Sequence, residues 1–447
     1  MIYRVFRAFW RAALFAFFRR VTVQGRENVP ETGPVLLVSN HTNAFVDPLV
    51  ILTALRRPVS LTAKSTLRKN PLLAALMRAH KVIELHRAQD VGAGADLAKN
   101  TDALAACRRR LEEGGAVCIF PEGVSHSDPA MRPFRTGAAR IALDFLADGG
   151  RALAIVPVGL HFEAKERFRS EAAVVFGAPF EAGGWLRAHP DADPRDLTDE
   201  MERRIRALTN NFAAEGEIAT FARAAELLEV ADVAPAPLGR ESADDVAARV
   251  TLVHRLQAGR ERLAAERPGE LAALEGRIDG LYAELERLGI TAPELFLPME
   301  APRAAFFVFR EVETLLVGAP VAAWGWLNHL PAYAVLRALV RKMSTDRDHF
   351  ASNAVVLSLP VVPLFVLLQT ALVALLTRSA GWTIVYALSL PYSAAVALLY
   401  RDRAGSVLRR ARTFLFFLRH RGRQRELAAT ARAITDDIRR LAADLER

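Results

Sequence analysis

Short apolar runs alternate with longer helical patterns between residues 21 and 215. Apolar runs bounded by turn residues predict buried strands, and apolar positions spaced three or four apart predict helices. The predicted strands are Val35–Val38, Val59–Thr62, Val82–Leu85, Ala116–Phe120, Ala154–Val158 and Ala173–Phe176. The predicted helices are Leu49–Leu55, Pro71–Ala79, Ala95–Glu113, Gly137–Ala147 and Leu197–Phe212. Strands separated by helices predict an α/β domain with a mixed, largely parallel sheet flanked by helices.

Residues 1–20 contain arginines and aromatic residues but no acid. Arg4, Arg7 and Arg11 fall on one stripe of a helix, and the aromatic side chains supply an apolar surface. The arginines interrupt the apolar region, which is unlike a signal peptide. The pattern predicts a basic amphipathic helix in the membrane interface. The alternative is a helix that packs on the core of the chain itself.

Residues 216–300 are rich in Ala, Glu, Arg and Leu and show no strand pattern. We expect two or three amphipathic helices, broken near 234–237 and near Pro268-Gly269. The alternating charges are typical of a solvated helical face rather than of a binding site.

The membrane signal lies in residues 301–400. Phe350–Thr377 and Ser379–Tyr400 contain no charged residue, and only Arg378 separates them. Each stretch is long enough to cross about 30 Å of hydrocarbon, so a helical hairpin is predicted at about 350–400. The uncharged stretch Thr314–Leu336 is interrupted by two prolines, and it spans the bilayer, dips into it or packs on its surface.

Arginines follow the predicted hairpin: nine of them lie from Arg401 to Arg425. The positive-inside rule then places both ends of the hairpin, the α/β domain and a basic tail at 401–447 in the cytoplasm. The expected location is a bacterial-type inner membrane or its equivalent.

Composition narrows the possible partners. The chain has 447 residues, a formal net charge of +9 and 51% hydrophobic residues, so we expect two or three domains. The positive charge suits an anionic membrane surface or an acidic substrate, and no nucleic-acid-binding motif is present. The two cysteines, Cys107 and Cys118, imply no disulfide framework and no metal site and are interpreted as small buried residues.

Two loops that follow predicted strands carry candidate chemistry. His41 and Asp47 lie between the first strand and the next helix, and Phe120-Pro121-Glu122-Gly123 follows a later strand. Histidine is suited to remove a proton from an attacking hydroxyl at neutral pH. Asp47 is expected to accept a hydrogen bond from the other ring nitrogen; alternatively, it only caps the helix that starts at Pro48. His86 and His126, beside these loops, are interpreted as ordinary polar positions.

A resemblance to a known family rests on four blocks in order. Asn40-His41 with Asp47, then Arg87, then Phe-Pro-Glu-Gly at 120–123, then Val156-Pro157-Val158-Gly159 resemble the glycerolipid acyltransferase superfamily, over roughly residues 20–215. Five residues separate His41 from Asp47, where the usual pattern has four. This spacing, the Ser-His after Glu122-Gly123 and the membrane C-terminus are similar to a branch related to fungal glycerol-3-phosphate/dihydroxyacetone-phosphate acyltransferases. So are Phe168-Arg169-Ser170 and the later Phe176-Gly177-Ala178-Pro179.

The resemblance implies roles for the matching residues. His41 and Asp47 would be catalytic, and Arg87 would contact a phosphate group. Glu122 would bind a glycerol hydroxyl or orient Arg87, and Gly123 would allow a tight turn beside the substrate. Lys64, at the end of a predicted strand, is a second candidate for the phosphate because parallel strands end at one sheet edge.

The expected reaction is transfer of a fatty acyl group from acyl-CoA or acyl carrier protein to glycerol-3-phosphate or its 1-acyl product. No cofactor or metal is implied, and the partners would be the bilayer, the acyl donor and the phosphorylated glycerol acceptor. Another lysophospholipid as acceptor is one alternative. A catalytically inactive lipid-binding membrane protein is the other.

Overall fold

The computed structural model describes residues 2–64, 82–85, 96–149, 152–232, 246–296, 301–344 and 347–445. The chain forms two compact units. The sheet unit comprises Met1–Asn211 together with Val340–Val356, and the helical unit comprises Phe212–Leu339 together with Leu357–Arg447. The predicted helix Pro71–Ala79 and the predicted phosphate contact Arg87 lie outside the described residues.

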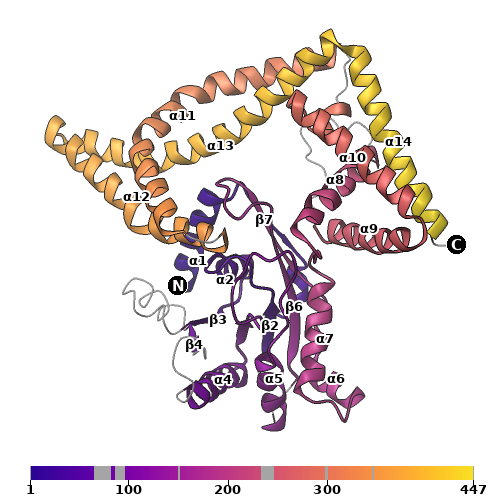
Figure 1. Cartoon of the computed structure of the whole chain (residues 1–447). Helices are drawn as coiled ribbons and strands as arrows, with labels where there is room; N and C mark the ends of the chain where they lie inside the picture. Colours follow the sequence, from indigo (N-terminus) through magenta and orange to yellow (C-terminus); the bar gives the residue numbers. More distant parts are fainter. Residues whose placement is uncertain are drawn as a thin grey trace. The chain divides into compact units, whose positions relative to one another are not determined.

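Eight strands form the sheet in the described part of the sheet unit (Figure 1), in the order β1-β7-β6-β2-β5-β3-β4, with β8 beside β6. The strands are β1 Arg20–Gln24, β2 Val35–Ser39, β3 Val59–Lys64, β4 Ile83–Leu85, β5 Ala116–Ile119, β6 Ala154–Phe162, β7 Glu171–Phe176 and β8 Phe180–Glu181. Neighbours are parallel except where β6 pairs with β7 and β8. All six predicted strands are present, and the mixed, largely parallel sheet is confirmed. Strands β1 and β8 were not predicted from the sequence.

Helices cover both faces of this sheet. They are α1 Ile2–Phe17, α2 Val46–Ala54, α4 Asp96–Glu112, α5 Gly137–Ala147, α6 Ala182–Ala188 and α7 Pro194–Arg206, the last ending earlier than predicted. Leu36 and Val38 of β2 share one core with α4, α5 and α7. Because side chains alternate along a strand, Leu37 points to the opposite face, where α2 is buried at nearly every residue.

Helix α1 packs on the sheet unit by one of its faces. Trp10 and Leu14 are buried, the Trp10 ring contacts Phe45, and α1 contacts α2. This is the alternative in which the helix packs on the core of the chain. The other face leaves Val5 63% and Phe9 46% exposed, so α1 presents an exposed apolar stripe.

The helical unit contains a bundle of α8 Glu215–Asp232, α9 Val246–Glu266, α10 Pro268–Leu288 and α14 Arg421–Leu445. In the described part of the charged segment 216–300 three α-helices are present, and Pro268 starts the last of them; the predicted break near 234–237 lies outside the described residues. The residues predicted as a basic tail do not form a separate tail: α14 shares a hydrophobic core with α8 and α10. Arg423 Nη2 also lies 2.6 Å from Glu284 of α10.

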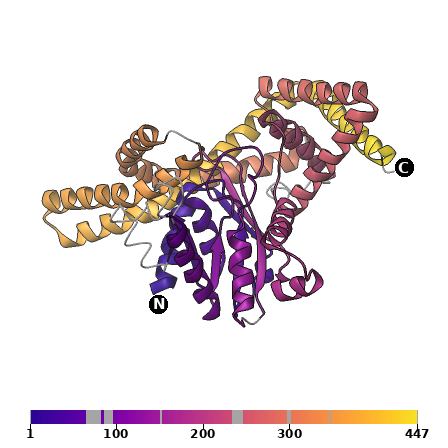
Figure 2. The same cartoon turned by 60° about the horizontal axis from the view of Figure 1, so that its bottom comes forward.

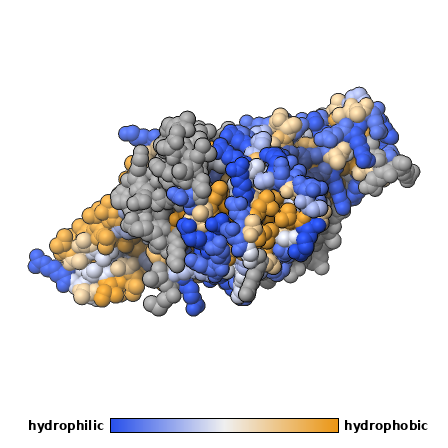
Figure 3. Space-filling view, turned by 90° about the horizontal axis from the view of Figure 1, so that it is seen from below, coloured by the Kyte–Doolittle hydropathy of each residue, from blue (hydrophilic) through white to orange (hydrophobic). Residues whose placement is uncertain are grey.

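Three long helices complete the helical unit: α11 Ala301–Met343, α12 Arg347–Thr377 and α13 Ala380–Arg419, preceded by the short 3₁₀ helix η3 Ala292–Phe296. In the described part of the chain, α12 and α13 are long and apolar enough to cross a membrane. Their ends near residues 377–380 form one arm (Figures 1 and 2), and hydrophobic residues gather on it in Figure 3.

The stretch Thr314–Leu336 lies within α11, which packs antiparallel to α13. Trp324 Nε1 donates to Ser389 Oγ at 3.1 Å, and a Cβ at Gly325 would lie 2.2 Å from the carbonyl oxygen of Ser393. A glycine is therefore required where the two helices approach. Tyr386 donates to Asn328, 2.5 Å away, at the point where all three helices meet.

Candidate active site

The His41 loop connects the carboxyl end of β2 to α2. Asn40, at the start of this loop, bonds to both backbone groups of Leu160 in β6, at 3.1 and 2.8 Å. The amide side chain thereby fixes the end of β2 against its neighbour. In open α/β sheets, ligands bind beyond the carboxyl ends of the strands, and His41 lies at such an end.

His41 and Asp47 are in direct contact. His41 Nδ1 lies 2.8 Å from Asp47 Oδ2, which also accepts hydrogen bonds from the amides of Thr42 and Asn43 at 2.7 and 2.8 Å. The Asp47 side chain is fully buried, whereas the His41 side chain keeps 12% of its surface exposed. Because a carboxylate only accepts, Nδ1 carries a proton and Nε2 is left as the basic nitrogen.

Asp47 does not cap the helix, so the predicted capping role is wrong. Helix α2 begins at Val46, and Phe45 is its N-cap. The Asp47 carboxylate instead bonds to amides of the loop before the helix. Those bonds fold the loop back over the carboxylate and bring His41 to it.

The His41 ring also stacks on Phe120, at the end of β5. The two ring centroids are 4.4 Å apart with an interplanar angle of 24°. Since β5 is a direct neighbour of β2, the sheet brings the His41 loop and the Phe120–Gly123 segment together. The aromatic face limits the rotation of the imidazole.

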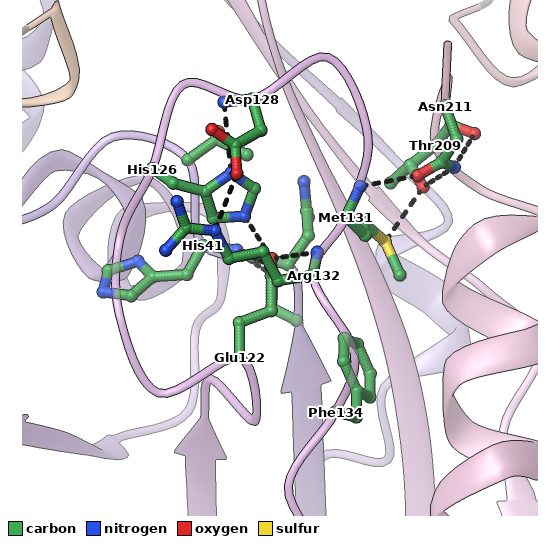
Figure 4. A network of polar contacts seen from close by, with 12 residues as sticks. His41, Glu122, His126, Asp128, Met131, Arg132, Phe134, Thr209 and Asn211 are labelled. Carbon is green, nitrogen blue, oxygen red and sulfur yellow. Dashed lines mark hydrogen bonds and ion pairs between the residues drawn. The ribbon is translucent and has the colours of Figure 1, made fainter. Parts of the chain in front are cut away.

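Glu122 is the centre of a buried polar network (Figure 4). Its Oε1 accepts from the backbone amide of His41 at 2.7 Å, and its Oε2 accepts from the amide of Arg132 at 2.9 Å. Its Oε2 also pairs with His126 Nε2. Glu122 is only 3% exposed, so its carboxylate holds three segments together rather than facing solvent. In Figure 4 the backbone of His41 faces the Glu122 carboxylate, and the His41 ring points away from it.

His126 belongs to this network, which the sequence analysis missed. It is 5% exposed, its backbone amide donates to the carbonyl of His41, and its Nδ1 accepts from the amide of Asp128. Lys165 Nζ donates to the carbonyl of His126 at 3.2 Å. The only hint of this contact in the sequence is that His126 lies four residues after Glu122. That spacing does not show that a histidine in a loop is buried.

Gly123 adopts a left-handed conformation with φ of +76°, and its amide closes a turn on the carbonyl of Phe120 at 3.1 Å. A Cβ at this position would lie 3.0 Å from Nε of Arg135. The glycine therefore allows both the turn and the close approach of an arginine. Arg135 was not singled out from the sequence, and it adds an exposed cation to this loop.

The two predicted phosphate contacts are only partly described. Lys64 ends β3, and its backbone pairs with Leu85 of β4, two residues before Arg87 in the sequence. The backbone of Lys64 thus lies at the carboxyl edge of the sheet.

Neither cysteine has the properties of a nucleophile. Both are buried and free of disulfides. Burial raises the pKa of Cys107 to about 12, and burial together with the Asp47 carboxylate raises the pKa of Cys118 further. Within the described residues, no group of three metal-ligating side chains is present.

The known proteins that resemble this chain are named as acyltransferases. Residues 20–161 match the family model described as Acyltransferase. An uncharacterized acyltransferase of Schizosaccharomyces pombe is 27% identical over 249 residues, 36% of each chain. Glycerol-3-phosphate O-acyltransferase 2 of Saccharomyces cerevisiae is 34% identical over 107 residues, 24% of this chain and 14% of the relative. This chain thus spans about a third or less of the length of these two relatives.

A bacterial relative is matched over more of its length. The 1-acyl-sn-glycerol-3-phosphate acyltransferase of Borreliella burgdorferi is 28% identical over 202 residues, 45% of this chain and 73% of the relative. Among solved structures, the 1-acyl-sn-glycerophosphate acyltransferase PlsC of Thermotoga maritima aligns with 46% of this chain and 77% of its own, at 22% identity and a TM-score of 0.35.

Proposed function

We propose, from the premise that this chain belongs to the acyltransferase family through residues 20–161, that it is a membrane O-acyltransferase of phospholipid synthesis. It would transfer a fatty acyl group from acyl-CoA or acyl carrier protein to glycerol-3-phosphate or 1-acylglycerol-3-phosphate. The observation that carries the proposal is the 2.8 Å contact between His41 and a fully buried Asp47. Relatives named for both acceptors support the substrate class.

In this proposal His41 is the general base. Asp47 holds the Nδ1 proton and orients the ring, so Nε2 takes the proton of the acceptor hydroxyl. The hydroxyl oxygen attacks the thioester carbonyl, the carbon–sulfur bond breaks, and the thiolate leaves and takes up a proton. As the imidazolium forms, the Asp47 carboxylate stabilises its charge. The acyl group passes directly between the substrates, since neither buried cysteine is a nucleophile.

Cations near the carboxyl edge of the sheet would bind the phosphate of the acceptor. Arginine suits this role because its planar guanidinium donates two parallel hydrogen bonds to phosphate. Arg87 and Lys64 are proposed from the sequence, and Arg135 is added because of its place over Gly123. Glu122 and His126 would keep the loops in place around these groups.

We further propose that α12 and α13 form the membrane hairpin. Exposed leucines support a lipid-facing surface: Leu375 is 74% and Leu376 75% exposed. The exposed stripe of α1, which carries Val5 and Phe9, would lie in the interface between the membrane and water.

The packing inside the helical unit supports an even number of crossings. Helix α14 packs on α8 and α10, so both ends of the segment 301–419 would lie on one face of the membrane. Residues 340–356, which end α11 and begin α12, belong to the sheet unit. In this proposal α11 returns to the side on which it starts and does not cross. The expected arrangement is one hairpin with Arg378 at its far end.

Acyl transfer by membranes that carry this protein tests the reaction, with the two acceptors offered separately and His41→Ala as the control. A His41-dependent product from glycerol-3-phosphate would indicate the first acylation, and one only from 1-acylglycerol-3-phosphate would indicate the second. Activity that persists in folded His41→Ala protein would refute the mechanism. If Arg87→Ala left both KM for the acceptor and the rate unchanged, Arg87 would not be the phosphate contact.

A further inference from the structure

The first turns of α12 carry a buried hydroxyl against the His41 loop. Ser352 is 4% exposed, and its neighbours Ala351 and Val355 are 0% and 2% exposed. The Ser352 Oγ donates to the carbonyl of Asn43 at 3.1 Å and accepts from the amide of Val46 at 3.2 Å. All of these residues belong to the sheet unit, although Ser352 is separated from Asn43 by 309 positions in the sequence.

The loop that Ser352 contacts is strained. Ala44, between the two bonded residues, has a φ of +38°, in the left-handed region that disfavours a residue with a Cβ. The amide of Val46 also donates to the carbonyl of Asn43 at 2.9 Å, which closes a turn around Ala44. The hydroxyl of Ser352 bonds to both ends of that turn. It therefore holds closed the one segment of the loop whose backbone conformation is unfavourable.

We propose that Ser352 is a positioning residue for the transfer reaction, supplied to the catalytic loop by the proposed membrane hairpin. This inference rests on the proposed function. The turn that Ser352 closes lies directly between His41 and Asp47. Asn43 donates its amide to the Asp47 carboxylate, and Val46 precedes Asp47 in α2. A turn that opens would move the carboxylate away from Nδ1 of His41.

The longer spacing between His41 and Asp47 gives a physical reason for the contact with Ser352. Five residues separate the pair, one more than the pattern that the sequence resembles. A longer loop has more conformations to lose when it orders, and a left-handed alanine adds to this cost. A hydrogen-bonded bridge from another element offsets that cost, and α12 provides it.

The test compares full-length protein with Ser352→Ala and Ser352→Thr in lipid nanodiscs. Steady-state transfer and hydrogen exchange of the peptide that covers residues 40–47 are measured on each. We expect Ser352→Ala to lower kcat about tenfold, or ~1.4 kcal/mol of barrier, with KM for both substrates unchanged. Exchange in this peptide should accelerate about tenfold while the rest of the sheet unit exchanges as before. Ser352→Thr, which keeps the hydroxyl, should restore both quantities.

The neighbouring Asn353 is the matched control. Its side chain bonds to Met343 and Ser344 and not to the His41 loop, so Asn353→Ala should leave kcat and loop exchange unchanged. A Ser352→Ala variant with kcat within about twofold of the original would overturn the proposal, whatever the exchange shows. A loss of kcat without faster exchange at 40–47 would overturn it too. If the unmodified protein acylates neither acceptor, the proposed function fails, but the exchange data still decide whether Ser352 holds the loop.

Discussion

The two units use the same aliphatic residues in opposite ways. In the sheet unit Leu36, Leu37 and Leu52 are completely buried, whereas Leu375 and Leu376 at the end of α12 are three-quarters exposed. The difference lies in what covers the side chains: the sheet unit covers its own, and α12 and α13 leave many of theirs exposed. A uniform apolar composition therefore says little until the packing partner is known.

Both units contain a buried, hydrogen-bonded glutamate, but the two glutamates differ in what they contact. Each glutamate ties distant segments together. In the sheet unit, the Glu122 carboxylate bonds to His41, His126 and Arg132. In the helical unit, the Glu294 carboxylate bonds to Thr291, Arg409 and Thr413, at 2.9 to 3.2 Å. Only the first of these carboxylates touches the loop with the proposed base.

The largest expected effect on transfer activity comes from removing the Glu122 carboxylate, with Glu294 as the comparison. Glu122→Ala leaves two buried amides and His126 without their acceptor, so we expect a loss of about 3 kcal/mol in the free energy of unfolding of the sheet unit and near-complete loss of transfer. Glu294→Ala should destabilise the helical unit but leave kcat within about twofold. Denaturant unfolding and transfer assays on both variants measure this. Equal losses of kcat would mean that the two networks are not separate in function.

The second prediction compares the loss of a buried leucine side chain with the loss of an exposed one. Leu37→Ala removes a fully buried side chain and should cost about 2–5 kcal/mol of stability. Leu376→Ala, in a residue that is 75% exposed, should change the stability of protein in detergent by less than about 0.5 kcal/mol. Thermal unfolding of the two variants in the same detergent makes the comparison. Similar losses would show that Leu376 is covered by protein.

A smaller effect is expected at the proposed phosphate site. Arg135→Ala should raise KM for the phosphorylated acceptor about tenfold, the loss of one charge-assisted hydrogen bond, with little change in kcat. Arg132→Ala is the control, because its guanidinium Nε already bonds to Asp128 at 2.7 Å. Initial rates over a range of acceptor concentrations measure both. An unchanged KM in Arg135→Ala would remove Arg135 from the site.

The mildest test leaves activity intact and reads topology. Arg378→Cys should react with a membrane-impermeant maleimide from the face opposite the catalytic domain, and Gly422→Cys from the catalytic face. The native cysteines are buried and should stay unlabelled in folded protein. Labelling of both positions from the same face would show that the hairpin does not cross.

Much of the sheet unit could be predicted because its signals are local. A buried parallel strand is a continuous apolar run, and each of the six runs predicted as strands between residues 35 and 176 contains a strand. β1 was missed because polar Arg20, Thr22 and Gln24 alternate with its two valines, and its pairing with β7 at the sheet edge depends on a distant segment. The end of α7 was misplaced because helix boundaries depend on tertiary contacts.

The candidate site divides in the same way. His41, Asp47, Glu122 and Gly123 stand in short motifs after strands, so the sequence alone pointed to them and the sheet brings them together. Arg135 and Ser352 carry no local signal, and the signal at His126 does not reveal its burial. Each is an ordinary residue type whose importance comes from burial or from a contact across the fold.

Hydrophobic periodicity and turn chemistry act over a few neighbouring positions, so the central strands, most of the helices, the two apolar segments of the proposed hairpin and the residues of the His41 loop could be predicted from the sequence alone. Only the tertiary structure decided that Asp47 faces the loop rather than the helix, that α14 completes the bundle of α8 and α10, and that Ser352 reaches the loop of Asn43. These contacts join positions up to 309 residues apart. They depend on the complete packing of each unit, which no short window of residues contains.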